Sequence, residues 1–364
     1  MKIGFDVSDL ATNRADGTTR YTRELVKRLP ALAPHDIWQL YSPRDFTESI
    51  SSNTEKIISP WPKYWTQSRF AWDVLKHKPD ILFMPIQQLP ILRSKTMKTV
   101  AVIHDLAFHR FSQQTGYKDW LLLHAFTAQV AREADRIIAV SQATADDIAH
   151  YYGRTKHVHV VHHGVDHDKF RVLSEQEKQT GWQKLTTAYP ILRPNYILYV
   201  GQIQPRKNLV RLIEAFELLR AKQPDLQLVI AGGHGWKQQS ILAKIKNSSA
   251  KDGILLTGPV ADELLPALYA HAEVFTLVSL YEGFGMPILE AMACGIPVVT
   301  SNVSSMPEIA GEAAVLVDPH SSEAIAAGIA TALSDTTLGH KGIERAKHFT
   351  WEKTAQQTFD VLKS

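Results

Sequence analysis

The sequence of 364 residues is poor in cysteine and in excess charge. Its one cysteine, Cys294, excludes a disulfide within the chain. Lysine and arginine number 40 against 37 aspartates and glutamates, a balance too even for a nucleic-acid-binding surface. It permits weak attraction to an anionic surface and no more.

Long apolar runs are also absent. No run approaches the roughly 18 residues of a transmembrane helix. The N-terminal sequence MKIGFDVSDL lacks the apolar core of a signal peptide. We therefore expect a cytoplasmic protein, whose contact with a membrane is at most peripheral, at the inner face.

Two glycine-rich phosphate-binding motifs are missing as well. The chain has no G-x-G-x-x-G after a predicted strand and no G-x-x-x-x-G-K-[ST]. Their absence argues against a dinucleotide-dependent dehydrogenase and against a P-loop kinase or ATPase. A phosphate site in this chain would have to be built in another way.

Short runs rich in isoleucine and valine alternate with amphipathic stretches along most of the chain. The strands that this pattern predicts are 1–7, 37–42, 80–85, 99–104, 136–140, 157–163, 196–201, 226–232, 253–258, 273–278, 296–301 and 313–318. Strands that alternate with helices are typical of parallel sheets covered on both faces. We predict an α/β protein with two doubly wound Rossmann-like domains that face a cleft, at residues 1–165 and 193–348, with a polar linker at 166–192.

A phosphate site is predicted where the strand 196–201 ends. The loop after it carries Arg206 and Lys207, and Asn208 is a good N-cap for the helix that follows. Two cations beside the positive end of a helix dipole are mildly unfavourable alone. A bound anion reverses the sign and also uses the unpaired amides of the first turn.

The segment YEGFGMPILEAMACGIPVVT at 281–300 places two carboxylates around a glycine-rich turn. Glu282 follows a predicted strand, where ligands bind in open parallel sheets. Glu290 lies in or near the first turn of a short helix, whose dipole favours its ionised form. An ionised carboxylate accepts hydrogen bonds from two adjacent hydroxyls, as a ribose offers. Together with Arg206 and Lys207, the segment predicts a sugar-nucleotide site.

These residues resemble the retaining glycosyltransferases of the GT-B fold, in the large group that includes bacterial mannosyltransferases. The signature is Glu-x(7)-Glu, from Glu282 to Glu290. The supporting stretches are GTTRYTREL at 17–25, HDLAFHRF at 104–111, AVSQATADDI at 139–148, HHGVDHDKF at 162–170, YVGQIQPRKNL at 199–209, LVIAGGHGW at 228–236 and SSMPEIAGEAAVLVDP at 304–319. The resemblance covers nearly the full length.

The resemblance implies a role for each matching residue. Arg206 and Lys207 would hold the donor diphosphate, Glu282 would contact the donor sugar near the reacting centre, and Glu290 would bind the ribose hydroxyls. The other implied residues are His104 for the donor sugar and phosphate, the amides of Phe284, Gly285 and Met286 for sugar hydroxyls, Gly17 and Thr18 for the diphosphate, Gly258 for the base, and Asp16 and Asp105 for the acceptor.

The implied activity is transfer of a sugar with retained anomeric configuration, without a metal or cofactor. GDP-mannose is the first expectation for the donor and a UDP-sugar is the alternative; the acceptor would be a glycan or a lipid-linked sugar. A GT-B epimerase or phosphorylase and a non-catalytic sugar-nucleotide binder are the competing hypotheses. The resemblance also implies that a C-terminal helix, 349–364, returns to the first domain. The oligomeric state stays open.

Several other features have competing interpretations. Residues 166–168 read Asp-His-Asp, the form of a metal-binding motif in the other glycosyltransferase fold, but they lie between the two predicted domains. Five histidines crowd residues 157–167 without a cysteine or carboxylate framework for zinc. The cluster WPKYW at 61–65 suits an acceptor surface or a membrane interface, and more often packs under a helix. Cys294 is interpreted as a small core residue.

Overall fold

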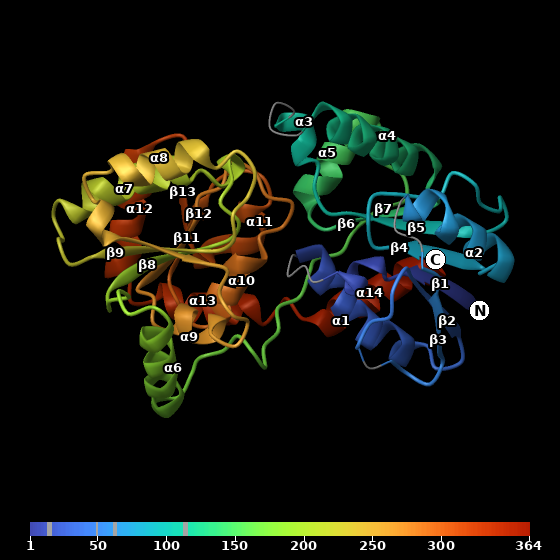
Figure 1. Cartoon of the computed structure of the whole chain (residues 1–364), viewed down its shortest axis with the longest axis horizontal. Helices are drawn as coiled ribbons and strands as arrows, with labels where there is room; N and C mark the ends of the chain where they lie inside the picture. The colour runs from blue at the N-terminus through green and yellow to red at the C-terminus, as the bar shows by residue number, and fades with distance from the viewer. Residues whose placement is uncertain (13–16, 49, 61–63, 112–115) are drawn as a thin grey trace. The chain divides into compact units, whose positions relative to one another are not determined.

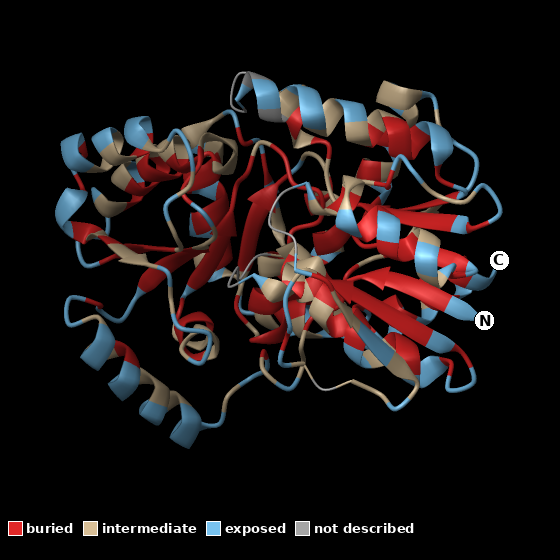
Figure 2. Cartoon of the chain, turned by 45° about the vertical axis from the view of Figure 1, so that its right-hand side comes forward, coloured by how far each residue is buried: buried red, intermediate tan, exposed pale blue. Residues whose placement is uncertain are grey.

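The computed structural model describes residues 1–12, 17–48, 50–60, 64–111 and 116–364. The chain divides into two compact units (Figure 1). The first unit contains Met1–Gly164 and Trp351–Ser364, and the second contains Val165–Thr350. Within each unit, buried strands lie between helices whose outer faces are exposed (Figure 2).

The first unit is built on a parallel sheet of seven strands in the order β3-β2-β1-β4-β5-β6-β7. The strands are β1 (Lys2–Asp6), β2 (Ile37–Ser42), β3 (Thr54–Ile58), β4 (Ile81–Met84), β5 (Lys98–Ile103), β6 (Arg136–Ala139) and β7 (Val158–Val160). The helices are η1 (Ser8–Ala11), α1 (Gly17–Leu32), η2 (Trp65–Gln67), α2 (Arg69–His77), α3 (Ala107–Arg110), α4 (Tyr117–Glu133), α5 (Gln142–Tyr152) and α14 (Trp351–Lys363).

The C-terminal helix α14 packs against α1 in the first unit. The rings of Tyr21 and Trp351 lie 6.3 Å apart, and both side chains are buried. The Thr354 hydroxyl donates a hydrogen bond to the carbonyl of His162 (2.8 Å). The last 14 residues therefore contribute to the core of a unit whose other residues all precede Val165.

The second unit is built on a parallel sheet of six strands in the order β10-β9-β8-β11-β12-β13. The strands are β8 (Tyr196–Val200), β9 (Gln227–Ala231), β10 (Ile254–Gly258), β11 (Val274–Leu277), β12 (Val298–Ser301) and β13 (Val315–Val317). The helices are α6 (Glu175–Ala188), η4 (Pro205–Lys207), α7 (Leu209–Arg220), α8 (Gln239–Asn247), η5 (Lys251–Gly253), α9 (Leu265–Ala270), α10 (Met286–Ala293), α11 (Met306–Ala310), η6 (Gly311–Ala313), α12 (Ser322–Ser334) and α13 (Leu338–Ala346).

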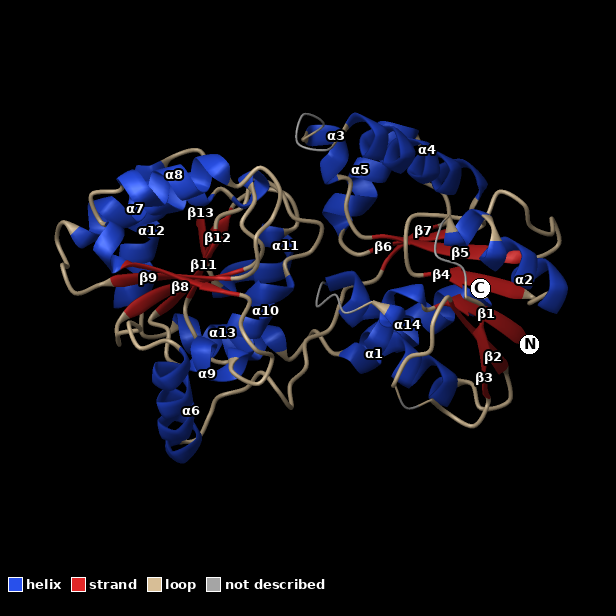
Figure 3. Ribbon diagram, in the orientation of Figure 1, coloured by secondary structure: helices blue, strands red, loops and turns tan. Residues whose placement is uncertain are grey.

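The prediction of two doubly wound parallel sheets is confirmed, because helices cover both faces of each sheet (Figure 3). The sequence pattern missed one strand, β3, at the edge of the first sheet. Its residues Glu55 and Lys56 are exposed, so it shows no continuous apolar run. The predicted strand 157–163 is shorter in the structure, since only Val158–Val160 pair with β6.

Gly232, just after β9, is the tightest backbone contact near the carboxyl edge of the second sheet. Its φ of +147° is a conformation that favours glycine, and a Cβ there would overlap the carbonyl oxygen of Gly201. Gly258, in the neighbouring strand, has a φ of +68° but open space around the Cβ position.

We expect Gly232→Ala to lower the free energy of unfolding of the second unit by at least about 3 kcal/mol, because backbone strain and steric overlap add. Gly258→Ala is the matched control and should cost about 1 kcal/mol, from its dihedral angle alone. Urea denaturation followed by circular dichroism measures both. Equal losses in the two variants would contradict the proposed overlap.

Candidate active site in the second unit

Three charged side chains meet at the carboxyl edge of the second sheet. Arg206 and Lys207 lie in η4, which follows β8, and Glu282 lies in the loop after the neighbouring strand β11. Glu282 Oε2 accepts a hydrogen bond from Arg206 Nη1 at 2.8 Å, and Oε1 accepts one from Lys207 Nζ at 2.6 Å. The structure therefore brings together the three residues that the sequence assigned to phosphate and sugar.

Glu282 is buried and ionised. Burial disfavours its charged form, but the charges of Lys207 and Arg206 and the hydrogen bonds from Lys207 and Ser279 outweigh this effect, so the pKa of Glu282 is lowered to about 2. Two cations against one carboxylate leave the group with a net charge of +1. Such a group repels other cations and attracts an anion.

Serine side chains fix the backbone of the Glu282 loop. Ser279 Oγ donates to Glu282 Oε1 at 2.6 Å. Ser304, whose φ is +58°, and Ser305 both donate to the carbonyl of Glu282, at 2.5 and 2.9 Å. Ser305 also donates to the carbonyl of Phe284 at 2.9 Å. Sequence reasoning did not assign these serines a role, although Ser304 and Ser305 begin one of the stretches that carry the resemblance.

The expectation that Asn208 caps α7 through its side chain is wrong. Asn208 occupies the N-cap position with a φ of +61°, and its side chain makes no capping hydrogen bond. Its buried amide instead donates to the carbonyls of Val278 (3.0 Å) and Pro319 (2.7 Å). Asn208 thereby joins the loop after β8 to the loops after β11 and β13, which holds Arg206 and Lys207 in place.

The turn into α10 carries the predicted sugar-binding amides. Gly285 is the N-cap with a φ of +103°, and Met286 is the first helical residue. Glu290 is the fifth residue of the helix, beyond its first turn, and is buried. The Tyr269 hydroxyl donates to Glu290 Oε2 at 2.8 Å, which fixes the orientation of the carboxylate.

The remaining predicted residue of this unit is Gly258, at the end of β10. Its φ of +68° and its carbonyl, which accepts a hydrogen bond from the Gly232 amide at 2.9 Å, place it in the turn that leaves the strand.

His104, Asp105, Gly17 and Thr18 lie after a strand of the first sheet or at the start of α1. His104 follows β5, and its Nε2 donates a hydrogen bond to the carbonyl of Pro85 at 2.7 Å. The rings of Tyr21 and His104 pack against each other with centroids 5.1 Å apart. Asp105 Oδ1 accepts a hydrogen bond from the Ala107 amide at 3.1 Å. Gly17 and Thr18 are the first residues of α1.

Two of the predicted features fall wholly or partly outside the described residues. Asp16 is one, and residues 61–63 of the aromatic cluster are another. Of that cluster, Tyr64 is 81% exposed and Trp65 packs against Phe70 with ring centroids 5.8 Å apart.

The surroundings of Cys294 and Asp166 indicate structural roles for both residues. Cys294 is buried, and burial together with the charge of Glu290 raises the pKa of its thiol to about 12, so it does not form a thiolate at neutral pH. Asp166 Oδ1 accepts hydrogen bonds from the amides of Asp168 and Lys169, both at 3.1 Å, as in a tight turn. In the part of the chain that the structure describes, no helix is long and apolar enough to cross a membrane.

Comparison with known proteins places this site in a family. Residues 188–349 match the model of the glycosyl transferases group 1, and residues 15–169 match that of the glycosyltransferase family 4. Both matches are to glycosyltransferase families, one over each half of the chain, and the second unit resembles the group 1 glycosyltransferases. The first match contains the whole constellation of Arg206, Lys207, Glu282 and Glu290.

Individual relatives agree with the family. The O-antigen chain mannosyltransferase B of Escherichia coli is 29% identical over 374 residues, which are 95% of this chain and 96% of the relative. The serotype-specific mannosyltransferase WbdA of Escherichia coli is 30% identical over 269 residues, which are 71% of this chain; the match spans 32% of WbdA, about a third of its length. A crystal structure of Alr3699/HepE from Anabaena, in complex with UDP and glucose, superposes with a TM-score of 0.76 at 20% identity and covers 100% of both chains, which shows the shared GT-B fold.

The low pKa of Glu282 predicts how acid acts on this glycosyltransferase. Its pKa is lowered from 4.5 to about 2 on folding, so Glu282 contributes stability that is present above about pH 4.5 and is lost as the pH falls toward 2. The contribution is about 3 kcal/mol at neutral pH, since one pKa unit corresponds to about 1.4 kcal/mol.

We expect Glu282→Gln to be about 3 to 5 kcal/mol less stable than the wild type at pH 7, because two half-buried cations lose the carboxylate that they share. The difference should shrink steadily in urea denaturation series at pH 4 and 3. Glu263→Gln, at an exposed glutamate, is the control and should show only a small difference from the wild type. A Glu282→Gln difference that stays constant down to pH 3 would refute the assignment.

Proposed function

We propose that this glycosyltransferase is retaining and metal-independent, and that it transfers mannose from GDP-mannose to a glycan or lipid-linked acceptor. The observation that carries the proposal is the pairing of Arg206 and Lys207 with the buried carboxylate of Glu282 at the carboxyl edge of β8 and β11. The mannosyltransferase that matches 95% of the chain supports the choice of sugar. The names of that relative and of WbdA support a role in surface-polysaccharide synthesis.

The proposed chemistry uses the cations to stabilise the leaving group. The bond between the anomeric carbon and the β-phosphate oxygen breaks, and negative charge develops on the nucleoside diphosphate. Arg206 and Lys207 lie at fixed positions beforehand, so they stabilise this charge without reorganisation. The acceptor oxygen forms its bond to the anomeric carbon on the same face, and its proton passes to the departing phosphate oxygen.

In this proposal Glu282 positions other groups and forms no covalent intermediate. Both of its oxygens accept hydrogen bonds from cationic side chains, and Ser279 adds a third bond to Oε1. A carboxylate with a pKa of about 2 is a weak base and carries no proton at neutral pH. Glu282 therefore sets the positions of Arg206 and Lys207 beside the donor sugar.

The other roles follow the resemblance and are part of the proposal. Glu290, oriented by Tyr269, would bind the ribose hydroxyls, and Gly258 would lie beside the base. The amides of residues 284–286 would hold sugar hydroxyls. From the first unit, His104 would contact the donor sugar, Gly17 and Thr18 the diphosphate, and Asp16 and Asp105 the acceptor.

A UDP-sugar is the second candidate for the donor, because the structure of Alr3699/HepE contains UDP. A panel of GDP-mannose, UDP-glucose and ADP-glucose, tested by thermal shift, separates the candidates. A ligand that binds only the native state raises the melting temperature, with about 2.7 kcal/mol of added stability at a concentration 100-fold above Kd. We expect the largest shift with GDP-mannose; a larger shift with UDP-glucose would identify the alternative donor and overturn the first choice.

The reaction class is tested by turnover with a radiolabelled donor. Label should pass to an acceptor glycan only when acceptor is present, whereas an epimerase converts the donor alone and a phosphorylase requires phosphate. Lys207→Met should reduce kcat by about 10²- to 10³-fold, because it removes one preorganised cation from the leaving group. Lys222→Met, at an exposed lysine after α7, is the control and should leave kcat unchanged. Unchanged turnover in a folded Lys207→Met variant would refute the assigned site.

A further inference from the structure

Two adjoining hollows lie at the amino edge of the second sheet, opposite the proposed donor site. Both are lined by Asn195, which precedes β8, and Glu273, which precedes β11. Their volumes are about 460 and 510 Å³, within the range of small-molecule sites. Asn195 and Gly201 flank the five residues of β8, so the two lie roughly 20 Å apart along the strand. The hollows therefore form a groove that is distinct from the donor site in the same unit.

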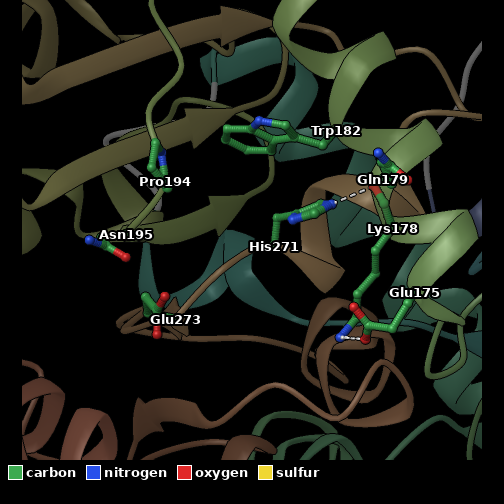
Figure 4. A pocket seen from close by; sticks show the side chains of 8 residues that line it. All are labelled: Glu175, Lys178, Gln179, Trp182, Pro194, Asn195, His271 and Glu273. Carbon is green, nitrogen blue, oxygen red and sulfur yellow. Dashed lines mark hydrogen bonds and ion pairs between the residues drawn. The ribbon is translucent and has the colours of Figure 1, made fainter.

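An aromatic wall closes one end of this groove. Trp182, on α6, packs against His271 with ring centroids 5.0 Å apart, and His271 Nε2 donates to the carbonyl of Lys178 at 2.9 Å. Figure 4 shows both rings between Pro194, Asn195 and Glu273 on one side and Glu175, Lys178 and Gln179 on the other. A Cβ at Gly181 would lie 2.7 Å from the Ala267 Cβ, so α6 and α9 approach closely at the residue before Trp182. The position of the indole is thereby fixed.

The rest of the groove is lined by apolar residues, Pro194, Pro224, Leu226 and Leu333, and by polar side chains. The first hollow contributes Glu175, Gln179, Asn195 and Glu273, and the second adds Gln223 and Asp225. Amides donate and accept hydrogen bonds and carboxylates accept two, which suits neighbouring hydroxyl groups. An aromatic face suits the C–H face of a sugar ring, because its π-system carries partial negative charge.

The charge of the groove excludes a nucleotide. Three carboxylates line it, those of Glu175, Glu273 and Asp225, against one ammonium, that of Lys178. Lys178 Nζ already pairs with Glu175 Oε1 at 3.3 Å. An anionic ligand would therefore be repelled, and a neutral polyhydroxyl ligand would find an aromatic wall and acceptors on both sides.

We propose that this groove binds a stretch of oligosaccharide, as a second saccharide site apart from the site of transfer. The inference rests on the proposed function in one respect, since it takes the ligand to be the glycan that the enzyme extends. If one glycan were bound both at the groove and at the site of transfer, the effective concentration of glycan at the enzyme would rise. Asn195 and Glu273 line both hollows, so an extended oligosaccharide fits them better than a single sugar.

Titration of the full chain with α-mannohexaose, observed by saturation-transfer NMR, tests this site. We expect the wild type to bind, Trp182→Ala to bind at least tenfold more weakly, and Trp182→Phe to retain most of the affinity. Trp72→Ala, at a 63% exposed tryptophan of the first unit, is the matched control and should bind like the wild type. Glu273→Ala removes an exposed groove residue with no effect on packing and should also weaken binding, which covers the case that Trp182→Ala does not fold.

The outcomes separate this site from the proposed function. Binding of α-mannohexaose that depends on Trp182, in an enzyme that transfers no mannose, supports the groove and refutes the choice of sugar. Normal transfer with equal α-mannohexaose affinity in the wild type, Trp182→Ala and Glu273→Ala refutes the groove. If spermidine at equal concentration displaced α-mannohexaose, the groove would be a cation site, and this result would also refute the proposed saccharide site. Lys207→Met should leave α-mannohexaose binding at the groove unchanged.

Discussion

Burial of the Glu282 carboxylate is the constraint on which the active edge of the second unit depends. A buried carboxylate without a partner costs several kcal/mol, so Glu282 requires the cations that reach it from another loop. Those cations, Arg206 and Lys207, lie 76 and 75 residues earlier in the chain. The loops after β8 and β11 therefore cannot adopt their conformations independently. Asn208 adds the loop after β13 to the same arrangement through Pro319.

In the proposed mechanism this arrangement has a consequence for catalysis. Because the pKa of Glu282 is about 2, its carboxylate stays ionised at any pH at which the protein works. Arg206 donates hydrogen bonds to Glu282 and to the carbonyl of Tyr281, and Lys207 donates to Glu282. In the proposed mechanism these fixed cations would need no rearrangement when a diphosphate leaves. Glu282, whose residue type would suit a general acid or base, thus serves to position two cations.

The sequence predicts the parts of the molecule in which local pattern and burial agree. Buried strands such as β4 and β6 read as continuous apolar runs, and both sheets followed from them. The edge strand β3 was not predicted because exposed residues such as Glu55 and Lys56 interrupt the apolar pattern. The sequence also did not predict the contacts between loops that are distant along the chain. Nothing local to Asn208 or Ser305 indicates that their side chains hold carbonyls of other loops, and Asn208 was assigned the capping role that its residue type favours.

The two ends of the second sheet carry opposite charges, which suits the two different ligands that we propose for them. At the carboxyl edge, loops after β8 and β11 bring cations together; at the amino edge, the residues before the same strands, Asn195 and Glu273, present an amide and a carboxylate. Helix α6 joins no two strands of one sheet, and Leu185 is its one fully buried residue, yet a capping box at Ser174 and Glu177 and the close contact at Gly181 hold it firmly. In the proposed saccharide groove, this helix would hold the Trp182 ring in place beside the ligand.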